Sequence, residues 1–172
     1  MRVMGFDPGY AIVGCGAVEY NNNSFTPVYY GAVTTSAGTP FEQRLLKIDS
    51  EIGDILDRIK PEAVAVEELF FTTNKKTVID VAQARGVIVL AVAKRGIPFF
   101  EYTPLQVKQS VVGYGRAEKH QVMEMTRLML SLREVPKPDD AADALAIAIC
   151  HAHAISSGFG GLQNAIKRGM VK

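Results

Sequence analysis

The sequence predicts an α/β fold in which helices flank a mixed five-stranded sheet. Two observations support this fold class. Three β-type segments joined by turn residues occupy the first 35 residues, and apolar residues then recur at helical spacing in segments that alternate with two short apolar strands. The length of 172 residues suits a single domain with an ordinary core.

The N-terminal part is predicted to form an antiparallel meander. Residues 2–7 and 11–20 have the composition of strands and are joined by a Pro-Gly turn. Asparagines at 21–23 make a second turn, which leads into a third strand ending near Thr35. Short turns of this kind join antiparallel strands.

An amphipathic helix is expected next. Its apolar positions alternate in steps of four and three residues and end before a proline: Phe41, Leu45, Ile48, Ile52, Ile55 and Ile59. Residues 63–69 then form a short apolar strand, which can lie parallel beside the first strand through a crossover. A second helix is expected over residues 78–95, and from 87 to 93 it is apolar on every side. Such a helix must be covered all round, either by a second copy of the chain or within one subunit.

The remaining chain is predicted to add one strand and three helices. The strand spans residues 97–102, and the following Thr103-Pro104 is a helix N-cap with proline at the first helical position. Helices are expected over residues 105–112, 117–132 and 139–155. The domain is therefore predicted to span residues 1–156, with the Gly-rich residues 157–172 as a flexible tail.

Composition predicts a soluble, cytoplasmic protein. No run approaches the roughly 18 apolar residues that a membrane span requires. Cys15 and Cys150 are far apart and lack paired metal-ligand spacing, which argues against a disulfide framework or a zinc site.

Charge is distributed unevenly although the net charge is only +1. Residues 41–68 hold eight acids and four bases, whereas residues 75–127 hold nine bases and four acids. The basic half could bind nucleic acid, or the two halves could simply be solvated faces of opposite charge.

Four acids are the candidates for chemistry. Asp7 and Glu67 each end an apolar strand, so they emerge at one edge of the sheet if those strands are parallel neighbours. Asp140 and Asp143 share one face of the last helix, and the alanines between them leave room for close approach. Carboxylates held close together repel, and a divalent cation removes that penalty. Oxygen-only ligands favour magnesium or manganese.

Four convergent acids can hold two metal ions about 4 Å apart, an arrangement that hydrolyses phosphodiesters. The alternative interpretation is that an aspartate caps the last helix. For Asp139 we prefer the cap, and for Asp140 both interpretations stand. The sequence neighbours of Asp143 are small or apolar. A charged side chain among them has no evident partner, which favours a functional role for Asp143.

Five motifs, in this order, resemble those of the RuvC Holliday junction resolvases. They are GFDPG (5–9), AVEELF (65–70), QARG (83–86), QVKQSVVG (106–113) and DAADALAIA (140–148). The similarity extends from the first strand to about His153, and five ordered motifs are far more specific than any one of them.

The resemblance implies an RNase H-like fold with sheet order 3-2-1-4-5, a homodimer, and magnesium-dependent paired nicking of four-way DNA junctions. It implies two Mg²⁺ ions per site, with Mn²⁺ as a substitute, and the RuvA and RuvB branch-migration proteins as partners. The catalytic and metal-binding acids carried over are Asp7, Glu67, Asp140 and Asp143.

The resemblance also implies DNA contacts. Lys108 and Lys119 match lysines that meet DNA near the scissile phosphate, although by themselves they read as solvated helix residues. Phe70 matches an aromatic residue that stacks on bases at the junction, and a core position is the alternative. Lys76 and Arg85 are weaker candidates for DNA contact.

Three other functions share part of this pattern. The Asp7-Pro8-Gly9 turn also resembles the phosphate loop of sugar kinases and actin-like ATPases, which need a second lobe that 172 residues cannot supply. An RNase H-like nuclease that processes structured RNA shares the first strand. A non-catalytic junction-binding protein would keep the basic half without needing the buried acids.

Overall fold

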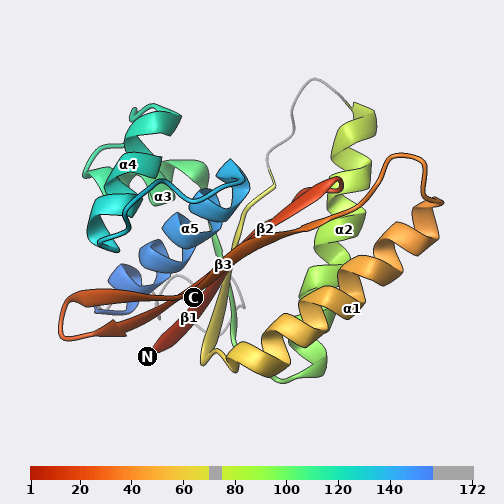
Figure 1. Cartoon of the computed structure of the whole chain (residues 1–172), viewed down its shortest axis with the longest axis horizontal. Coiled ribbons are helices and arrows are strands. Elements are labelled where there is room, and N and C mark those ends of the chain that lie inside the picture. The colour runs from red at the N-terminus through yellow and green to blue at the C-terminus, as the bar shows by residue number, and fades with distance from the viewer. Residues whose placement is uncertain (70–74, 157–172) are drawn as a thin grey trace, which may run out of the picture.

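The computed structural model describes residues 1–69 and 75–156, and for residues 75–77 the backbone only. The predicted tail, residues 157–172, lies outside this description, and so does Phe70. Figure 1 shows the strands and helices along the chain. The strands are β1 (Arg2–Asp7), β2 (Ile12–Asn21), β3 (Ser24–Thr34), β4 (Ala63–Glu67) and β5 (Phe99–Tyr102); the helices are α1 (Phe41–Ile59), α2 (Lys75–Lys94), α3 (Pro104–Val112), α4 (Lys119–Met129) and α5 (Asp139–Ser156).

The five strands form one sheet in the order β3-β2-β1-β4-β5. β1 and β2 pair antiparallel, and so do β2 and β3, whereas β4 runs parallel to both β1 and β5. The predicted meander, the parallel crossover to β4 and the sheet order are therefore confirmed.

Several predicted boundaries differ from the structure: α2 begins at Lys75 rather than at 78, and β4 ends at Glu67 rather than at 69. Helix α4 is shorter than residues 117–132, because Glu118 and Gln121 form a reciprocal capping box at its start and Ser131 adopts a left-handed φ of 52° beyond its end. Strand β5 begins at Phe99 rather than at 97, since the proline at 98 has no N–H to donate to a ladder.

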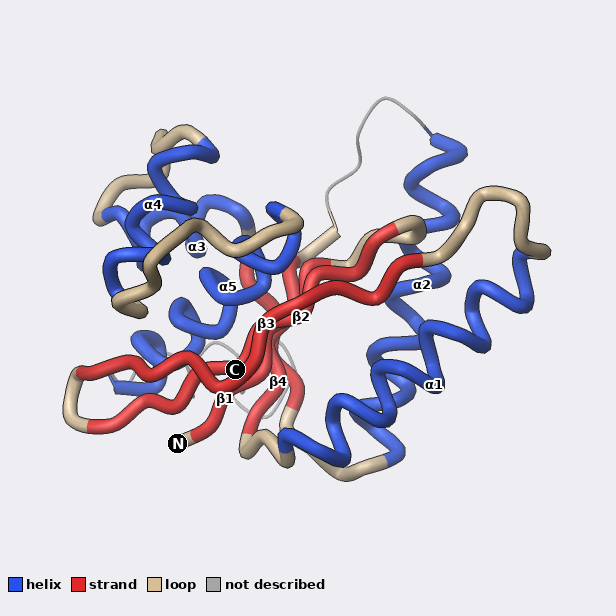
Figure 2. Tube along the Cα trace, in the orientation of Figure 1, coloured by secondary structure: helices blue, strands red, loops and turns tan. Residues whose placement is uncertain are grey.

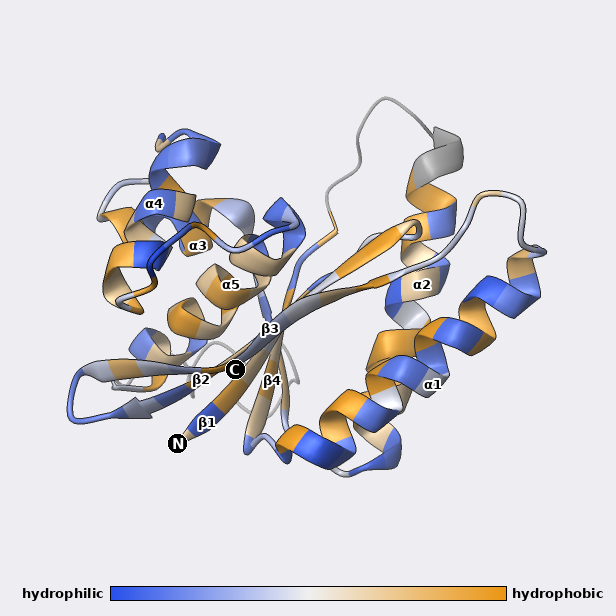
Figure 3. Ribbon diagram, in the orientation of Figure 1, coloured by the Kyte–Doolittle hydropathy of each residue, from blue (hydrophilic) through white to orange (hydrophobic). Residues whose placement is uncertain are grey.

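The helices cover the two faces of the sheet unequally (Figures 1 and 2). Helices α1 and α2 pack on one face, over a core that includes Met4, Phe6 and Val66. Helix α5 crosses the opposite face, with α3 and α4 packed against it, over a second core that includes Val3 and Ala65. Figure 3 shows the apolar side of α1 turned toward the sheet and its polar side turned outward.

Alternation along the strands decides which face each side chain occupies. On β1, Met4 and Phe6 belong to the core under α1, and Val3 belongs to the core under α5. Asp7, four residues after Val3, therefore faces α5. No helix of the described residues is long and apolar enough to cross a membrane.

Candidate active site

The first two acids lie at the carboxyl ends of adjacent parallel strands. β1 and β4 pair in register, with Phe6 opposite Val66, and Asp7 and Glu67 are the next residues of the two strands. Ala65 packs in the core under α5, so the alternation places Glu67 on the same face as Asp7. The pairing of two strands far apart in the sequence thus brings both carboxylates to one edge.

Helix α5 reaches the same edge because glycines let it approach the sheet closely. A β-carbon added at Gly5 or Gly14 would stand 2.0 Å from the carbonyl oxygen of Ala144 or Asp140, respectively. One added at Gly16 would stand 2.6 Å from the Leu145 backbone nitrogen. Any side chain at these positions would push the helix, and with it the last two acids, away from the sheet.

The electrostatics show that the four acids act on one another. Burial, and after it the charges of Glu67, Asp143 and Asp140 in that order, raise the pKa of Asp7 to about 7, while the charge of Lys119 opposes them. Burial, followed by the charge of Asp143, also raises the pKa of Glu67. The pKa of Asp143 is raised mainly by burial and lowered by its hydrogen bond to Lys119. Ionising all four acids together is therefore costly.

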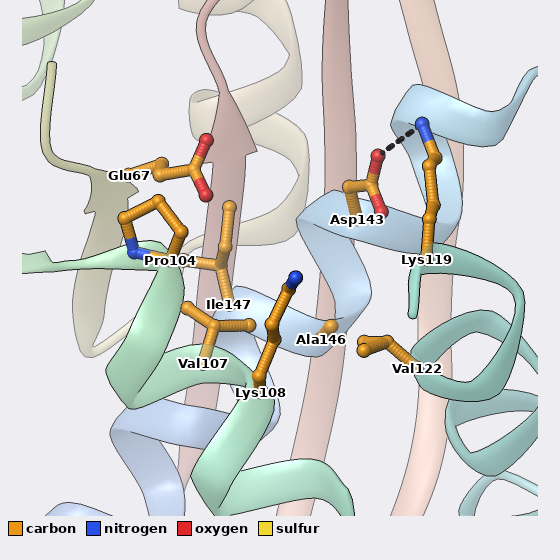
Figure 4. A pocket seen from close by; sticks show the side chains of 9 residues that line it. All are labelled: Glu67, Pro104, Val107, Lys108, Lys119, Val122, Asp143, Ala146 and Ile147. Atoms are coloured by element: carbon orange, nitrogen blue, oxygen red, sulfur yellow. Dashed lines mark ion pairs between the residues drawn. The ribbon is translucent and has the colours of Figure 1, made fainter. Parts of the chain in front are cut away.

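Two lysines face this group of acids. Lys119, at the start of α4, forms an ion pair with Asp143, with 2.9 Å between Nζ and Oδ2. Lys108 of α3 is near enough to lower the pKa of Glu67. Figure 4 shows both lysines at a cavity of about 250 Å³. The cavity is lined by Glu67, Pro104, Val107, Lys108, Lys119, Val122, Asp143, Ala146 and Ile147.

The donor chemistry of the four acids suits a hard divalent cation, because it offers only carboxylate oxygens and carries an excess of negative charge. In the described part of the chain, however, no three of these side chains converge tightly enough to enclose an ion. Figure 4 shows Glu67 and Asp143 on different sides of the cavity, with Asp143 engaged by Lys119.

Known proteins share this sequence over most of its length. A model of the family described as crossover junction endodeoxyribonuclease RuvC matches residues 3–151. The RuvC proteins of Caldanaerobacter subterraneus and Clostridioides difficile are 56% and 57% identical to this chain over 153 residues. Those residues make up 89% of this chain, 93% of the Caldanaerobacter protein and 90% of the Clostridioides protein. The chain belongs to the RuvC family.

Solved structures agree with this membership. RuvC of Thermus thermophilus matches in two structures, one of the protein alone and one in complex with Holliday junction substrate. Their sequence identities to this chain are 38% and 36%, and both have a TM-score of 0.86. Each match covers 92% of this chain and 98% of the Thermus chain. The yeast mitochondrial resolvase Ydc2, at 12% identity and a TM-score of 0.62, shares the fold. The RNase H-like fold implied by the motifs is confirmed.

The remaining predicted contact residues of this RuvC protein separate into two groups. Lys108 and Lys119 border the cavity that holds Glu67 and Asp143. Arg85 instead forms an ion pair with Glu101, and only 18% of its side chain is exposed. The DNA contact expected of Arg85 stays a prediction. Phe70 and the side chain of Lys76 lie outside the described residues.

Sequence reasoning missed the three glycines that seat helix α5. Their signal is present in the sequence, because Gly14 and Gly16 alternate within one strand and Gly5 lies opposite Gly16 on the next. Glycine inside a strand marks the close approach of another backbone. The alanine-rich start of α5 is the complementary signal.

Proposed function

We propose that this RuvC protein is a Holliday junction resolvase, which makes paired symmetric nicks in four-way DNA junctions during recombination and repair. The observation that carries the proposal is the meeting of four carboxylates from β1, β4 and α5 at one edge of the sheet, with two lysines beside them. The Thermus RuvC in complex with Holliday junction substrate supports the choice of a four-way junction.

Two Mg²⁺ ions, or Mn²⁺ in their place, would be held by Asp7, Glu67, Asp140 and Asp143. Bound there, they would supply activation of a water molecule and stabilisation of the leaving oxygen. Burial and the charges of neighbouring acids raise the pKa values of Asp7, Glu67 and Asp143, a cost that cation binding would relieve.

Lys108 and Lys119 would bind and orient the backbone phosphates of the strand to be cut. Both project from helices that border the cavity, and Lys108 lies near Glu67. A lysine ammonium acts on phosphate as a point charge, which contributes affinity without reading the base sequence. Phe70, Lys76 and Arg85 remain proposed contacts on the strength of the family resemblance alone.

A homodimer is part of the proposal. Paired nicks in a two-fold symmetric junction need two equivalent active sites, which a two-fold dimer supplies. Its candidate surface is the α1–α2 groove, with Leu46 and Leu90 exposed. The groove is lined by Glu42, Leu45, Leu46, Asp49, Val87, Leu90 and Lys94. RuvA and RuvB are proposed as partners from the family resemblance.

One experiment separates this function from its alternatives. A synthetic four-way junction, a matched linear duplex and a single-stranded structured RNA are each incubated with the protein, with and without Mg²⁺. We expect symmetric nicks in the junction only, and only with Mg²⁺. Cutting of the RNA alone would identify an RNA-processing nuclease, and tight junction binding without any cleavage would identify a binding protein.

The matched variant is Asp7→Asn, which removes a negatively charged oxygen ligand while leaving the lysines in place. Cleavage of the junction should fall by orders of magnitude while binding stays close to that of the parent protein. Normal cleavage by Asp7→Asn would overturn the assignment of the acids.

A further inference from the structure

The ion pair between Lys119 and Asp143 joins two different elements at the active site. Lys119 is the first residue of α4, and Asp143 lies one turn into α5. Their Nζ and Oδ2 atoms are 2.9 Å apart. Asp143 is thus the one acid of the four, in the described part of the chain, that has a lysine in direct contact.

Lys119 influences the whole acid group from this position. Its charge lowers the pKa of Asp7 and of Glu67 in addition to that of Asp143. Its own pKa is raised by its hydrogen bond to Asp143, and further by the charges of Asp143, Asp139 and Asp140. Lys119 therefore compensates part of the negative charge that a divalent cation would compensate.

We propose that Lys119 and a divalent cation compete for Asp143, so that a DNA phosphate which draws Lys119 away strengthens cation binding. Lys119 is then a positioning residue that couples the arrival of substrate to the completion of the metal site. The inference rests on the proposed function, because it takes the carboxylates as metal ligands and a phosphate as the competing partner of Lys119.

Side-chain geometry supports exchange of this kind. The Lys119 side chain is 58% exposed, whereas Asp143 is 27% exposed. A solvent-exposed lysine can swing from a carboxylate to a phosphate without disturbing the core, since its long aliphatic part has many rotamers. By thermodynamic linkage, a phosphate that favours cation binding is itself bound more tightly when the cation is present.

Lys108 provides a matched control. It borders the same cavity and lowers the pKa of Glu67 through its charge. Among residues 1–69 and 75–156, Lys108 acts on Glu67 only through this longer-range attraction and forms no ion pair with an acid. A change at Lys108 removes the same charge from the site without releasing a carboxylate.

The first test measures Mn²⁺ affinity by calorimetry on the full chain, after EDTA treatment and without DNA. Lys119→Met should bind Mn²⁺ roughly three- to fivefold more tightly than the parent, which corresponds to loss of a partly exposed ion pair. Lys108→Met should change the affinity by less than twofold. Unchanged or weaker Mn²⁺ binding by Lys119→Met would overturn the proposal. An equal gain of Mn²⁺ affinity in Lys108→Met would also overturn it, because the loss of one positive charge would then explain both results.

The second test uses the reciprocal effect. Junction affinity is measured by fluorescence anisotropy with and without Ca²⁺, and a denaturing gel verifies that the DNA stays intact. Ca²⁺ should tighten junction binding by the parent and by Lys108→Met, and should have a smaller effect on Lys119→Met. An equal effect on all three proteins would overturn the coupling. Failure of the parent to cut junctions with Mg²⁺ would instead reject the proposed substrate, whatever the Mn²⁺ affinities show.

Discussion

Gly14 lies directly against the backbone of Asp140: a β-carbon added at Gly14 would stand 2.0 Å from the Asp140 carbonyl oxygen. This contact joins β2 to the first turn of α5 and sets how close the helix comes to the sheet. The carboxylates of Asp140 and Asp143 reach the edge where Asp7 ends β1 because α5 begins at this distance.

Gly14→Ala should therefore damage the active site. The new methyl group meets backbone rather than a movable side chain, so the start of α5 must shift. We expect the free energy of unfolding to fall by about 1 to 3 kcal/mol, as overpacking does. Cleavage should fall at least tenfold at temperatures where circular dichroism shows the protein folded. Gly38→Ala is the control, because nothing lies within 4 Å of its β-carbon, and equal activity of the two variants would contradict the seating role.

Asp7 should make the protein less stable as pH rises. Its pKa of about 7 in the folded state exceeds the ordinary value of 3.8, so between these values the folded state holds a proton that the unfolded state has released. Stability from this group is present at low pH and is lost as pH rises through 7. Between pH 5 and pH 8 in EDTA, the unfolding free energy of the parent should fall by about 2 kcal/mol more than that of Asp7→Asn. If urea titrations give the parent and Asp7→Asn parallel profiles of unfolding free energy against pH, Asp7 ionises in the folded protein without a loss of stability.

His151 should contribute the opposite dependence at acid pH. It is fully buried, its Nδ1 lies 2.9 Å from the Tyr102 hydroxyl, and burial lowers its pKa to about 4. Between pH 6.5 and pH 4 the histidine binds a proton in the unfolded state, where its pKa is 6.5, but not in the folded state. The stability that this group contributes above pH 6.5 is therefore lost as pH falls toward 4. His151→Phe should lose about 2 kcal/mol less than the parent between pH 7.5 and pH 4.5. His120→Gln, at an exposed position, should follow the parent in the same urea titrations.

Arg44 should be important for stability. Its buried guanidinium donates from Nε to Thr35 Oγ1 at 2.8 Å and from Nη2 to the Tyr10 carbonyl at 3.3 Å, and it stacks 3.5 Å from the centre of the Tyr10 ring. Arg44→Met should lower the unfolding free energy by about 2 to 4 kcal/mol, since it breaks a buried hydrogen-bond network. Arg58→Met removes an exposed arginine of the same helix that lies 5.0 Å from the Tyr29 ring, and should cost less than 1 kcal/mol. A similar loss in both variants would show that the Arg44 contacts contribute little.

The dimer surface can be tested at Leu90. Its side chain is half exposed on α2 and borders the α1–α2 groove. A charge buried in an apolar interface is strongly unfavourable, so Leu90→Glu should convert a dimer to a monomer in light-scattering measurements. Leu128→Glu, at an equally exposed leucine of α4, should leave the mass unchanged. A dimer that survives Leu90→Glu would place the interface elsewhere.

Much of the fold could be read from local patterns. The alternation of β1 and β2, the three- and four-residue steps of α1 and the Thr103-Pro104 cap each concern neighbouring residues, and each corresponds to an element of the structure. The ion pair of Arg85 with Glu101, sixteen residues away, shows what such local patterns leave out. They cannot anticipate that pairing, because it depends on how α2 packs beside β5.

Local sequence patterns identified the candidates for chemistry: two acids at the ends of apolar strands, two at the start of the last helix, and two lysines in the basic half, in motifs that resemble RuvC. How these residues meet depends on the tertiary structure. The register of β1 with β4 aligns Asp7 with Glu67, the glycine contacts seat α5, and Lys119 takes Asp143 as its partner. These relations join residues far apart along the chain, and local preferences cannot determine them because they arise from packing of the whole domain.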